Sequence, residues 1–343
     1  MCSTTSKTIL AALTGAATVI AHGHVNNIIV NGVSWQGFDP TKMPYMPDPP
    51  TVVGWTTEQR DNGYIAPDQF ASSDIICHRD AKNAGGHAVV AAGDKVFIQW
   101  ESWPEGHHGP VIDYLASCGD AGCETVDKTS LKFFKIDEVG LVDGSVSPGK
   151  WGSDQLIANN NSWLVEIPPT IAPGFYVLRH EIIALHSAFD ANGAQNYPQC
   201  FNLEVTGGGS DTPDGVAATA LYSAQDAGIL LNIYYPPLSS YAIPGPALYS
   251  GAVSIAQAAS VATAASAAVT GSGAAAAPTD AAATPVANDG GAAAPTTEAS
   301  GSAATPDSAV TAAPVQPTSV PCTPHTRTVT VQARAHARDI RAH

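Results

Sequence analysis

Basic residues are scarce in this chain, which has 15 Lys and Arg against 30 Asp and Glu and a formal net charge of -15. Residues 22–250 carry the imbalance, with 25 acidic and 10 basic residues. Nucleic acids and anionic membranes both attract positive charge, so this composition argues against either as a partner. It suits a protein whose partner is uncharged.

Long apolar runs are also missing, except near the start of the chain. The segment Ile9–Ala21 is mostly apolar and follows a single cation, Lys7. It is short for a membrane span, and Val19 and Ala21 match the small-residue rule for signal peptidase. We interpret residues 1–21 as a secretory signal peptide, with an uncleaved anchor as the alternative. No other stretch could cross a bilayer, so we expect a secreted, extracellular monomer.

CxxC pairs are absent, which argues against a metal–thiolate site. Cys2 lies in the predicted signal and Cys322 in the tail, whereas four cysteines lie in the body: Cys77, Cys118, Cys123 and Cys200. In an exported domain four cysteines indicate two disulfides, with three possible connectivities. Cys118 and Cys123 flank a glycine-bearing turn that could close locally, which would leave Cys77 for Cys200.

Helical periodicity is scarce in residues 22–250, and short alternating runs replace it. Apolar residues alternate in 95–101, 162–167 and 200–205, and residues 175–186 are extended with apolar side chains on both parities. Clusters of Gly, Pro, Asn and Asp separate these runs, and only 217–221 resembles a brief helix. The pattern predicts an all-β fold, a β-sandwich with long loops.

One of these loops contains a glycosylation sequon, Asn160-Asn161-Ser162. The motif alone is weak, but an exported protein meets the glycosylation machinery. We therefore predict an N-linked glycan on Asn160.

Large apolar side chains almost disappear after residue 250. Residues 251–320 are mostly Ala, Thr, Ser, Pro and Gly, and they cannot bury enough surface to offset ordering entropy. We expect a disordered stalk that resembles O-glycosylated stalks. Residues 321–343 form a basic tail without the apolar end of a lipid anchor. A solvated tail is the default interpretation, and weak adhesion to acidic wall polymers is the alternative.

Removal of residues 1–21 would leave a mature chain that begins with His22. An N-terminal histidine offers an amine and an imidazole that can chelate one metal ion together. A second histidine in the segment WPEGHHGP, residues 103–110, could complete a three-nitrogen site. Copper has the highest affinity for such donors, and the amine, with an ordinary pKa near ~8, needs a strong Lewis acid to lose its proton. The sequence therefore predicts copper.

Other polar residues could surround such a metal. Tyr197 is a candidate axial phenol, and Gln195 lies two positions before it, on the same side of an extended segment. His186 has the same parity as His180 in the run 175–186. A His and Gln pair near the metal could hydrogen-bond a reduced oxygen species. Each residue also has an ordinary interpretation, as a solvated terminus or loop, or as a buried side chain with its polar atom bonded.

These residues lie in motifs that match a known family. The motifs are the signal followed by His-Gly, then HHGPVIDYLASC, LRHEIIALHSA and AQNYPQCFNLEV. On these motifs the chain resembles the fungal cellulose-active lytic polysaccharide monooxygenases, auxiliary activity family nine, once classified as glycoside hydrolases. The resemblance covers residues 22–250. It implies an immunoglobulin-like β-sandwich with a flat substrate face around one copper ion.

The resemblance also implies a role for particular residues. His22, through its amine and side chain, and His107 would bind copper with Tyr197 in the axial position, and His108 would have a supporting role. His186 and Gln195 would take part in catalysis near the metal. The remaining implied residues are the disulfides Cys77–Cys200 and Cys118–Cys123 and three substrate-binding tyrosines, Tyr45, Tyr234 and Tyr235.

The function that the resemblance implies is oxidative cleavage of cellulose at C1, C4 or both. It would need copper, an external electron donor (a small reductant or a redox protein) and O2 or H2O2. Two alternatives from other classes stay open. A glycoside hydrolase would need two carboxylates that flank a groove, and no such pair stands out. A non-catalytic copper-binding or wall-binding protein could share the ligands, but it would not need the residues around the metal.

Overall fold

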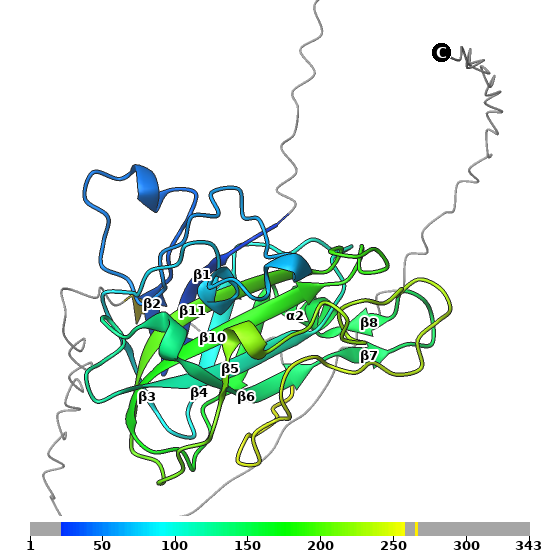
Figure 1. Ribbon diagram of the computed structural model, residues 1–343. Helices are drawn as coiled ribbons and strands as arrows, with labels where there is room; N and C mark the ends of the chain where they lie inside the picture. The colour runs from blue at the N-terminus through cyan, green and yellow to red at the C-terminus, as the bar shows by residue number, and fades with distance from the viewer. Residues whose placement is uncertain (1–21, 258–264, 267–343) are drawn as a thin grey trace, which may run out of the picture. The chain divides into compact units, whose positions relative to one another are not determined.

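The described part of the protein is built around two β-sheets packed face to face (Figure 1). The computed structural model describes residues 22–257 and 265–266. The five-stranded sheet has the order β13-β2-β1-β4-β9 and the six-stranded sheet the order β12-β6-β5-β10-β11-β3. The strands of the two sheets are β1 Val25–Val30, β2 Val33–Gln36, β3 Ala88–Ala91, β4 Lys95–Trp100, β5 Val111–Gly119, β6 Lys132–Val139, β9 Ser162–Glu166, β10 Gly174–Ala184, β11 Gln195–Thr206, β12 Val216–Ala217 and β13 Ala265–Ser266. The predicted β-sandwich is confirmed.

Helices are few and short, as the sequence predicts. The α-helices are α1 Asp74–Cys77 and α2 Gly152–Ala158, and the 3-10 helices are η1 Met43–Tyr45, η2 Pro67–Gln69, η3 Lys128–Ser130 and η4 Ala218–Ala220. The brief helix expected near 217–221 is η4. A third, two-stranded sheet pairs β7 Leu141–Asp143 with β8 Lys150–Trp151. Within the described ranges, no helix reaches the length and apolar character needed to cross a bilayer.

Strand β10 lies at the centre of the six-stranded sheet, between β5 and β11. Its alternate residues pack on opposite sides: Leu178 and Ile182 face the core between the sheets, and Val177 and Ile183 face a second apolar layer. Because both faces are covered, apolar residues occupy both parities of this strand. The same arrangement explains why the sequence shows no simple alternation there.

Long loops and short helices form that second apolar layer. It includes residues of the segments 55–84 and 218–243, which pack on the side of the six-stranded sheet away from the five-stranded one. A buried ion pair, Arg179 with Glu181 at 2.8 Å, lies in this layer, and Asn196 donates to Glu181 at 2.9 Å. Buried charges require such partners. The loops therefore hold the outer face of β10 and β11 rigidly.

Contacts with the sandwich continue beyond residue 250, the predicted end of the catalytic domain. The side-chain amide of Gln257 both donates to and accepts from the main chain of Leu164, at 2.8 and 2.9 Å. Ala265 and Ser266, within the stretch predicted to be disordered, pair with β2. Both contacts lie at sheet edges, where main-chain groups are open for pairing. The predicted signal, most of the stalk and the basic tail with Cys322 lie outside the described residues.

Candidate metal centre

His22 lies just before β1, and its ring meets two predicted partners. Its ring centroid is 5.1 Å from that of His107 and 5.4 Å from that of Tyr197. The three residues come from different parts of the chain: the segment before β1, the loop between β4 and β5, and β11. The fold therefore brings together the three residues that the sequence predicts as metal ligands.

Hydrogen bonds at both His107 and His108 anchor the loop that carries them. The indole Nε1 of Trp103 donates to the carbonyl of His107 at 3.0 Å. The neighbouring His108 donates from Nδ1 to Asp154 at 3.1 Å. A Cβ at Gly109 would collide with the carbonyl of Ile183, so this position needs glycine. His108 is thus bonded to Asp154, while the ring of His107 lies against that of His22.

His186 lies beside His107, with ring centroids 4.0 Å apart. The prediction that the extended segment reaches His186 is wrong, because β10 ends at Ala184 and His186 lies in a turn. The ladder ends where Leu185 donates its N–H to the carbonyl of His108 at 2.8 Å. The parity argument therefore fails for His186, and the turn, rather than the strand, places it at the site.

Tyr197 and Gln195 share one side of β11, as their spacing predicts. The hydroxyl of Tyr197 donates to Oε1 of Gln195 at 2.7 Å. The Tyr197 ring also packs edge-on against Trp103, with centroids 4.9 Å apart, and lies 6.0 Å from the ring of Tyr64. The rings of Trp103 and Tyr64 thus flank the phenol, and its hydroxyl is held by Gln195.

The imidazoles of the site are held uncharged. Burial, reinforced by the neighbouring imidazoles, lowers the pKa of His107 to about 4. Burial also lowers the pKa of His22 and of His186. It raises the pKa of the Tyr197 hydroxyl above the ordinary value. At neutral pH the site presents neutral nitrogen donors and a neutral phenol, which is the chemistry that a copper ion takes.

The side chains alone do not complete a metal site. In residues 22–257 and 265–266, no group of three or more His, Cys, Asp and Glu side chains is placed to hold a metal ion. Two imidazoles need a further donor, and an amine on His22 would supply it only after removal of residues 1–21. The Nδ1 atom of His186 is buried and has no hydrogen-bond partner among the described residues. The residues present therefore fit a metal held by a processed amino end.

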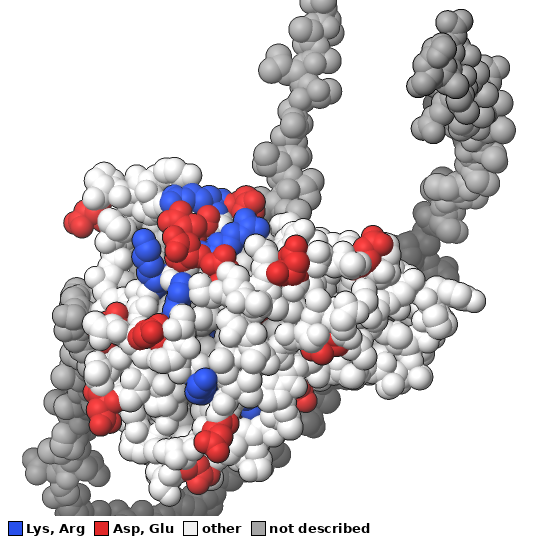
Figure 2. All heavy atoms as spheres, viewed as in Figure 1, with Lys and Arg blue, Asp and Glu red and all other residues white. Residues whose placement is uncertain are grey.

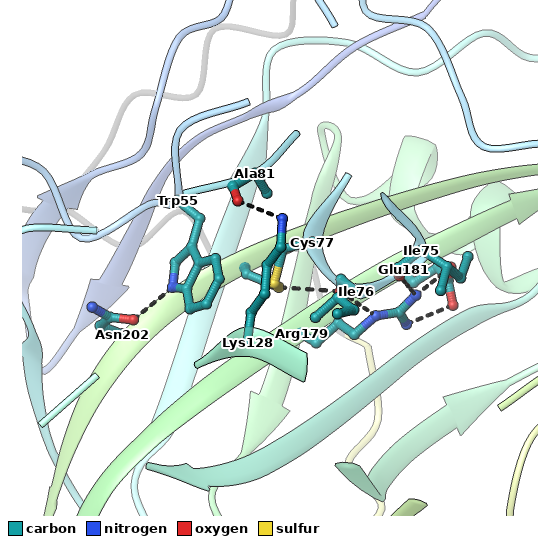
Figure 3. Close-up of a disulfide and its surroundings, with 10 residues drawn as sticks. Trp55, Ile75, Ile76, Cys77, Ala81, Lys128, Arg179, Glu181 and Asn202 are labelled. Atoms are coloured by element: carbon teal, nitrogen blue, oxygen red, sulfur yellow. Dashed lines mark hydrogen bonds and ion pairs between the residues drawn. A yellow bond between two sulfur atoms is a disulfide. The ribbon is translucent and has the colours of Figure 1, made fainter. Parts of the chain in front are cut away.

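A disulfide between Cys77 and Cys200 ties β11 to α1, and a second joins Cys118 to Cys123. Figure 3 shows the surroundings of Cys77: Trp55 donates to Asn202 on one side, and Arg179 reaches the carbonyls of Ile75 and Ile76 on the other. The pairing that the resemblance implied is thus present. It holds β11 three residues beyond Tyr197.

The three predicted substrate tyrosines are solvent-exposed. The exposed fractions are 71% for Tyr45, 43% for Tyr234 and 78% for Tyr235. The guanidinium of Arg60 lies 5.6 Å from the ring centroid of Tyr45. The predicted glycosylation residue, Asn160, is also exposed and lies in its predicted loop. On the face drawn in Figure 2, charged side chains of both signs gather near the upper edge, and most of the remaining surface is uncharged.

Sequence reasoning missed three residues around the site. Trp103 lies four positions before His107 in the same motif, so it could have been found there. Tyr64, whose ring lies 6.2 Å from that of His22, and Asn62, which contacts the main chain of His22, lie in a loop without a recognisable pattern. Only the folded chain brings this loop to the amino end of the domain.

A hollow of about 540 Å³ lies between residues 216–228 and 242–246. It contains none of the predicted site residues, and Asp226 is the one carboxylate among its lining residues. A glycoside hydrolase uses a pair of carboxyl groups. This hollow therefore gives no support to the hydrolase alternative.

The fold and the site together define a class of protein. In this class a β-sandwich carries a site of histidines and a phenol, with exposed tyrosines, in place of a carboxylate-lined cleft. The family model Auxiliary Activity family 9 (formerly GH61) matches residues 22–241. The AA9 family lytic polysaccharide monooxygenase D of Podospora anserina is 59% identical over 288 residues, which is 84% of this chain and 83% of that protein. A Malbranchea cinnamomea monooxygenase of the family is 62% identical over 249 residues, 73% of this chain and 74% of that protein.

Among solved structures, the extended catalytic domain of H. jecorina LPMO9A is 57% identical, with a TM-score of 0.69 over 73% of this chain and 100% of that chain. This chain belongs to Auxiliary Activity family 9. It is therefore a lytic polysaccharide monooxygenase, an oxidoreductase that cleaves polysaccharide by copper-dependent oxidation. Family membership excludes the hydrolase and non-catalytic alternatives.

Proposed function

We propose that the mature protein binds one copper ion, which the amine and imidazole of His22, the imidazole of His107 and the Tyr197 hydroxyl would hold. The observation that carries this proposal is that three rings from distant segments meet. The centroid of the His22 ring lies 5.1 Å from that of His107 and 5.4 Å from that of Tyr197. Their neutral state supports it, because metal ligands must be deprotonated. The family match begins at His22, which supports cleavage after residue 21.

Copper, when bound, would accept electrons from an external donor and would let O2 or H2O2 oxidise a carbon at the glycosidic bond. The protein's own residues hold and direct this chemistry. The imidazole of His186 packs against His107, and in this proposal it would donate or accept a proton near the metal. Gln195 holds the Tyr197 hydroxyl and offers its amide group beside it. We assign both as catalytic residues around the metal.

We propose cellulose as the substrate, cleaved at C1, C4 or both. A solved relative from M. thermophila is named a cellulose-active polysaccharide monooxygenase, and it is 29% identical with a TM-score of 0.58. A crystalline polysaccharide surface cannot enter a pocket, so its sugar rings must stack on exposed aromatics. Tyr45, Tyr234 and Tyr235 have the exposure that such stacking requires. The electron donor is a small reductant or a redox protein.

We infer that the protein is secreted as a monomer and carries a glycan on Asn160. Two disulfides support export, because such bonds persist in oxidising compartments. The exposed position of Asn160 supports its modification.

The experiment compares two histidines that are neighbours in the sequence. Secreted wild-type protein, His107→Ala and His108→Ala are loaded with copper and incubated with phosphoric-acid-swollen cellulose, ascorbate and oxygen. Mass spectrometry of the products is expected to show oxidised oligosaccharides for the wild type and for His108→Ala, and none for His107→Ala. Oxidised products that persist in EDTA-treated, copper-free protein would refute the proposal.

A further inference from the structure

Next to His22 lies a polar group that the proposed reaction does not use. It consists of the buried Asn62 and His24 and the partly buried Glu101, and we call it the amino-end latch. Asn62 is 5% exposed and His24 is 1% exposed. Burying polar side chains costs free energy unless they are hydrogen-bonded, so this group needs a structural or functional reason.

The side-chain amide of Asn62 joins two segments that carry metal ligands. Its Oδ1 accepts from Nδ1 of His24 at 3.1 Å, and its Nδ2 donates to Oε1 of Glu101 at 2.8 Å and to the carbonyl of His22 at 3.5 Å. His22 and His24 belong to the amino end, whereas Glu101 opens the loop that carries His107. The amide of Asn62 therefore bridges the amino end and the loop that carries His107.

The main chains of these two segments are also in contact. The N–H of Glu101 donates to the carbonyl of His24 at 3.1 Å. A Cβ on Gly23 would collide with the carbonyl of Ser102, so the approach requires glycine. The amino end thus lies against the first residues of the loop that carries His107, and the amide of Asn62 adds side-chain hydrogen bonds to this contact.

The loop of Asn62 reaches the third predicted ligand as well. Three residues further on, Ile65 exchanges main-chain hydrogen bonds with Asn196 at 2.9 and 3.0 Å, next to Tyr197. Asn62 itself has a φ of 53°, a left-handed conformation that asparagine tolerates better than most residues. A single short loop therefore contacts the amino end, the His107 loop and the strand of Tyr197.

We propose that Asn62 is a positioning residue for the copper site: its amide fixes the main chain of residues 22–24 so that the amine and imidazole of His22 face His107. This inference rests on the proposed function, since it concerns the same site. Without the amide, residues 22–24 lose the side-chain hydrogen bonds that tie them to the loop of Asn62 and keep their main-chain bond to Glu101 and their ring contacts. Partners that orient metal ligands typically contribute tenfold to 100-fold in metal affinity.

The test uses glycine, which adopts the left-handed conformation freely and so removes only the side chain. Asn62→Gly is compared with Asn31→Gly, a matched control. Asn31 has a φ of 49°, and its Nδ2 donates to a carboxylate, Asp94, at 2.7 Å in the hairpin at the far end of β1. Both substitutions thus remove an asparagine of the same backbone conformation and the same type of bond.

Two measurements on the mature protein decide the question. Copper affinity by calorimetry is expected to fall about tenfold or more in Asn62→Gly, with an altered electron paramagnetic resonance spectrum, and to stay unchanged in Asn31→Gly. Hydrogen exchange of metal-free protein is expected to be faster over residues 22–30 in Asn62→Gly alone. Equal affinity in both variants, with exchange unchanged, would overturn the proposal.

The exchange measurement needs no metal, so it separates the two proposals. Wild-type protein that binds no copper would refute the proposed function. Faster exchange in Asn62→Gly would still support the role of Asn62 in holding the amino end through the amino-end latch. If Asn62→Gly does not fold, Glu101→Gln decides, because it keeps the shape and weakens the bond to Asn62. Weaker copper binding at an unchanged melting temperature would support the proposal, and unchanged binding would overturn it.

Discussion

The hydroxyl of Tyr197 donates a hydrogen bond to Oε1 of Gln195, 2.7 Å away on the same side of β11. Burial holds this hydroxyl in its neutral form by raising its pKa. The phenol therefore offers a neutral oxygen to the space in front of His22, and Gln195 determines its orientation. At this position a neutral phenol oxygen would be a weak donor to a bound metal, and it would alter the metal's spectrum more than its affinity.

Removal of this hydroxyl provides a direct test. Tyr197→Phe is expected to keep copper bound, because the two histidines remain, and to change the resonance spectrum and the rate of oxidative cleavage. Tyr64→Phe serves as the control, since its ring lies 6.0 Å from that of Tyr197 and 6.2 Å from that of His22. A spectrum that is the same in Tyr197→Phe and wild type would remove Tyr197 from the coordination sphere.

A mature protein with one extra residue before His22 is expected to bind copper weakly. The extension turns the amine of His22 into an amide, which binds metal only after it loses a far less acidic proton, and it moves the free amine to the added residue. The amine and imidazole of His22 then no longer form one chelate, so we expect copper affinity to fall severely. Calorimetry measures the loss, and proteolytic removal of a cleavable extension should restore binding. Full affinity in the extended protein would contradict the chelate.

The two disulfides are expected to contribute unequally to stability. Cys77 and Cys200 are separated by 123 positions and Cys118 and Cys123 by 5. In the chain-entropy model the long loop contributes roughly 4–5 kcal/mol and the short one about 2 kcal/mol. Denaturant unfolding of the double alanine variants of each pair measures both losses. A larger loss for the short loop would show that contacts, and not loop entropy, dominate.

Stability is expected to fall as the pH rises toward neutrality because of Asp137. Burial, with the nearby Asp113, raises the pKa of Asp137 to about 7, from an ordinary value of 3.8. Between these values the folded protein holds a proton that the unfolded chain has lost, so stability decreases with rising pH, by up to about 4 kcal/mol.

Asp137→Asn tests this assignment. The amide removes the titration and keeps an oxygen for the indole of Trp163, which donates to Asp137 at 3.1 Å. Unfolding free energies between pH 4 and pH 8 should decrease less with pH in this variant than in the wild type or in a variant of the exposed Asp190. Parallel pH profiles for Asp137→Asn and wild type would show that another group is responsible.

Much of the fold could be predicted from local pattern. The alternating runs at 95–101 and 162–167 correspond to β4 and β9, because each strand has one face toward the core. The run 175–186 was correctly predicted as extended, but its end was not. Its last residues leave the ladder where the main chain of His108 pairs with Leu185, and nothing near residue 185 indicates that distant partner.

The candidate site likewise has one part that local sequence predicts and another part that it does not. The chemistry predicted for His22, His107 and Tyr197 follows from residue type, from the predicted signal peptide and from motif, all of which are local. The latch residue Asn62 has no such signal, since its partners His24 and Glu101 lie 38 and 39 positions away. An ordinary polar loop and a loop that orients a metal ligand look alike in one sequence.

The sequence by itself determined which donors the protein has, that its body is β structure, and which family it resembles, because side-chain chemistry and alternation are properties of neighbouring residues. Only the tertiary structure decided that His186 meets His107 from a turn, that Trp103 and Tyr64 surround Tyr197, and that one amide joins the amino end to the next ligand loop. Those contacts depend on how two sheets and their loops pack, and packing is a property of the whole chain.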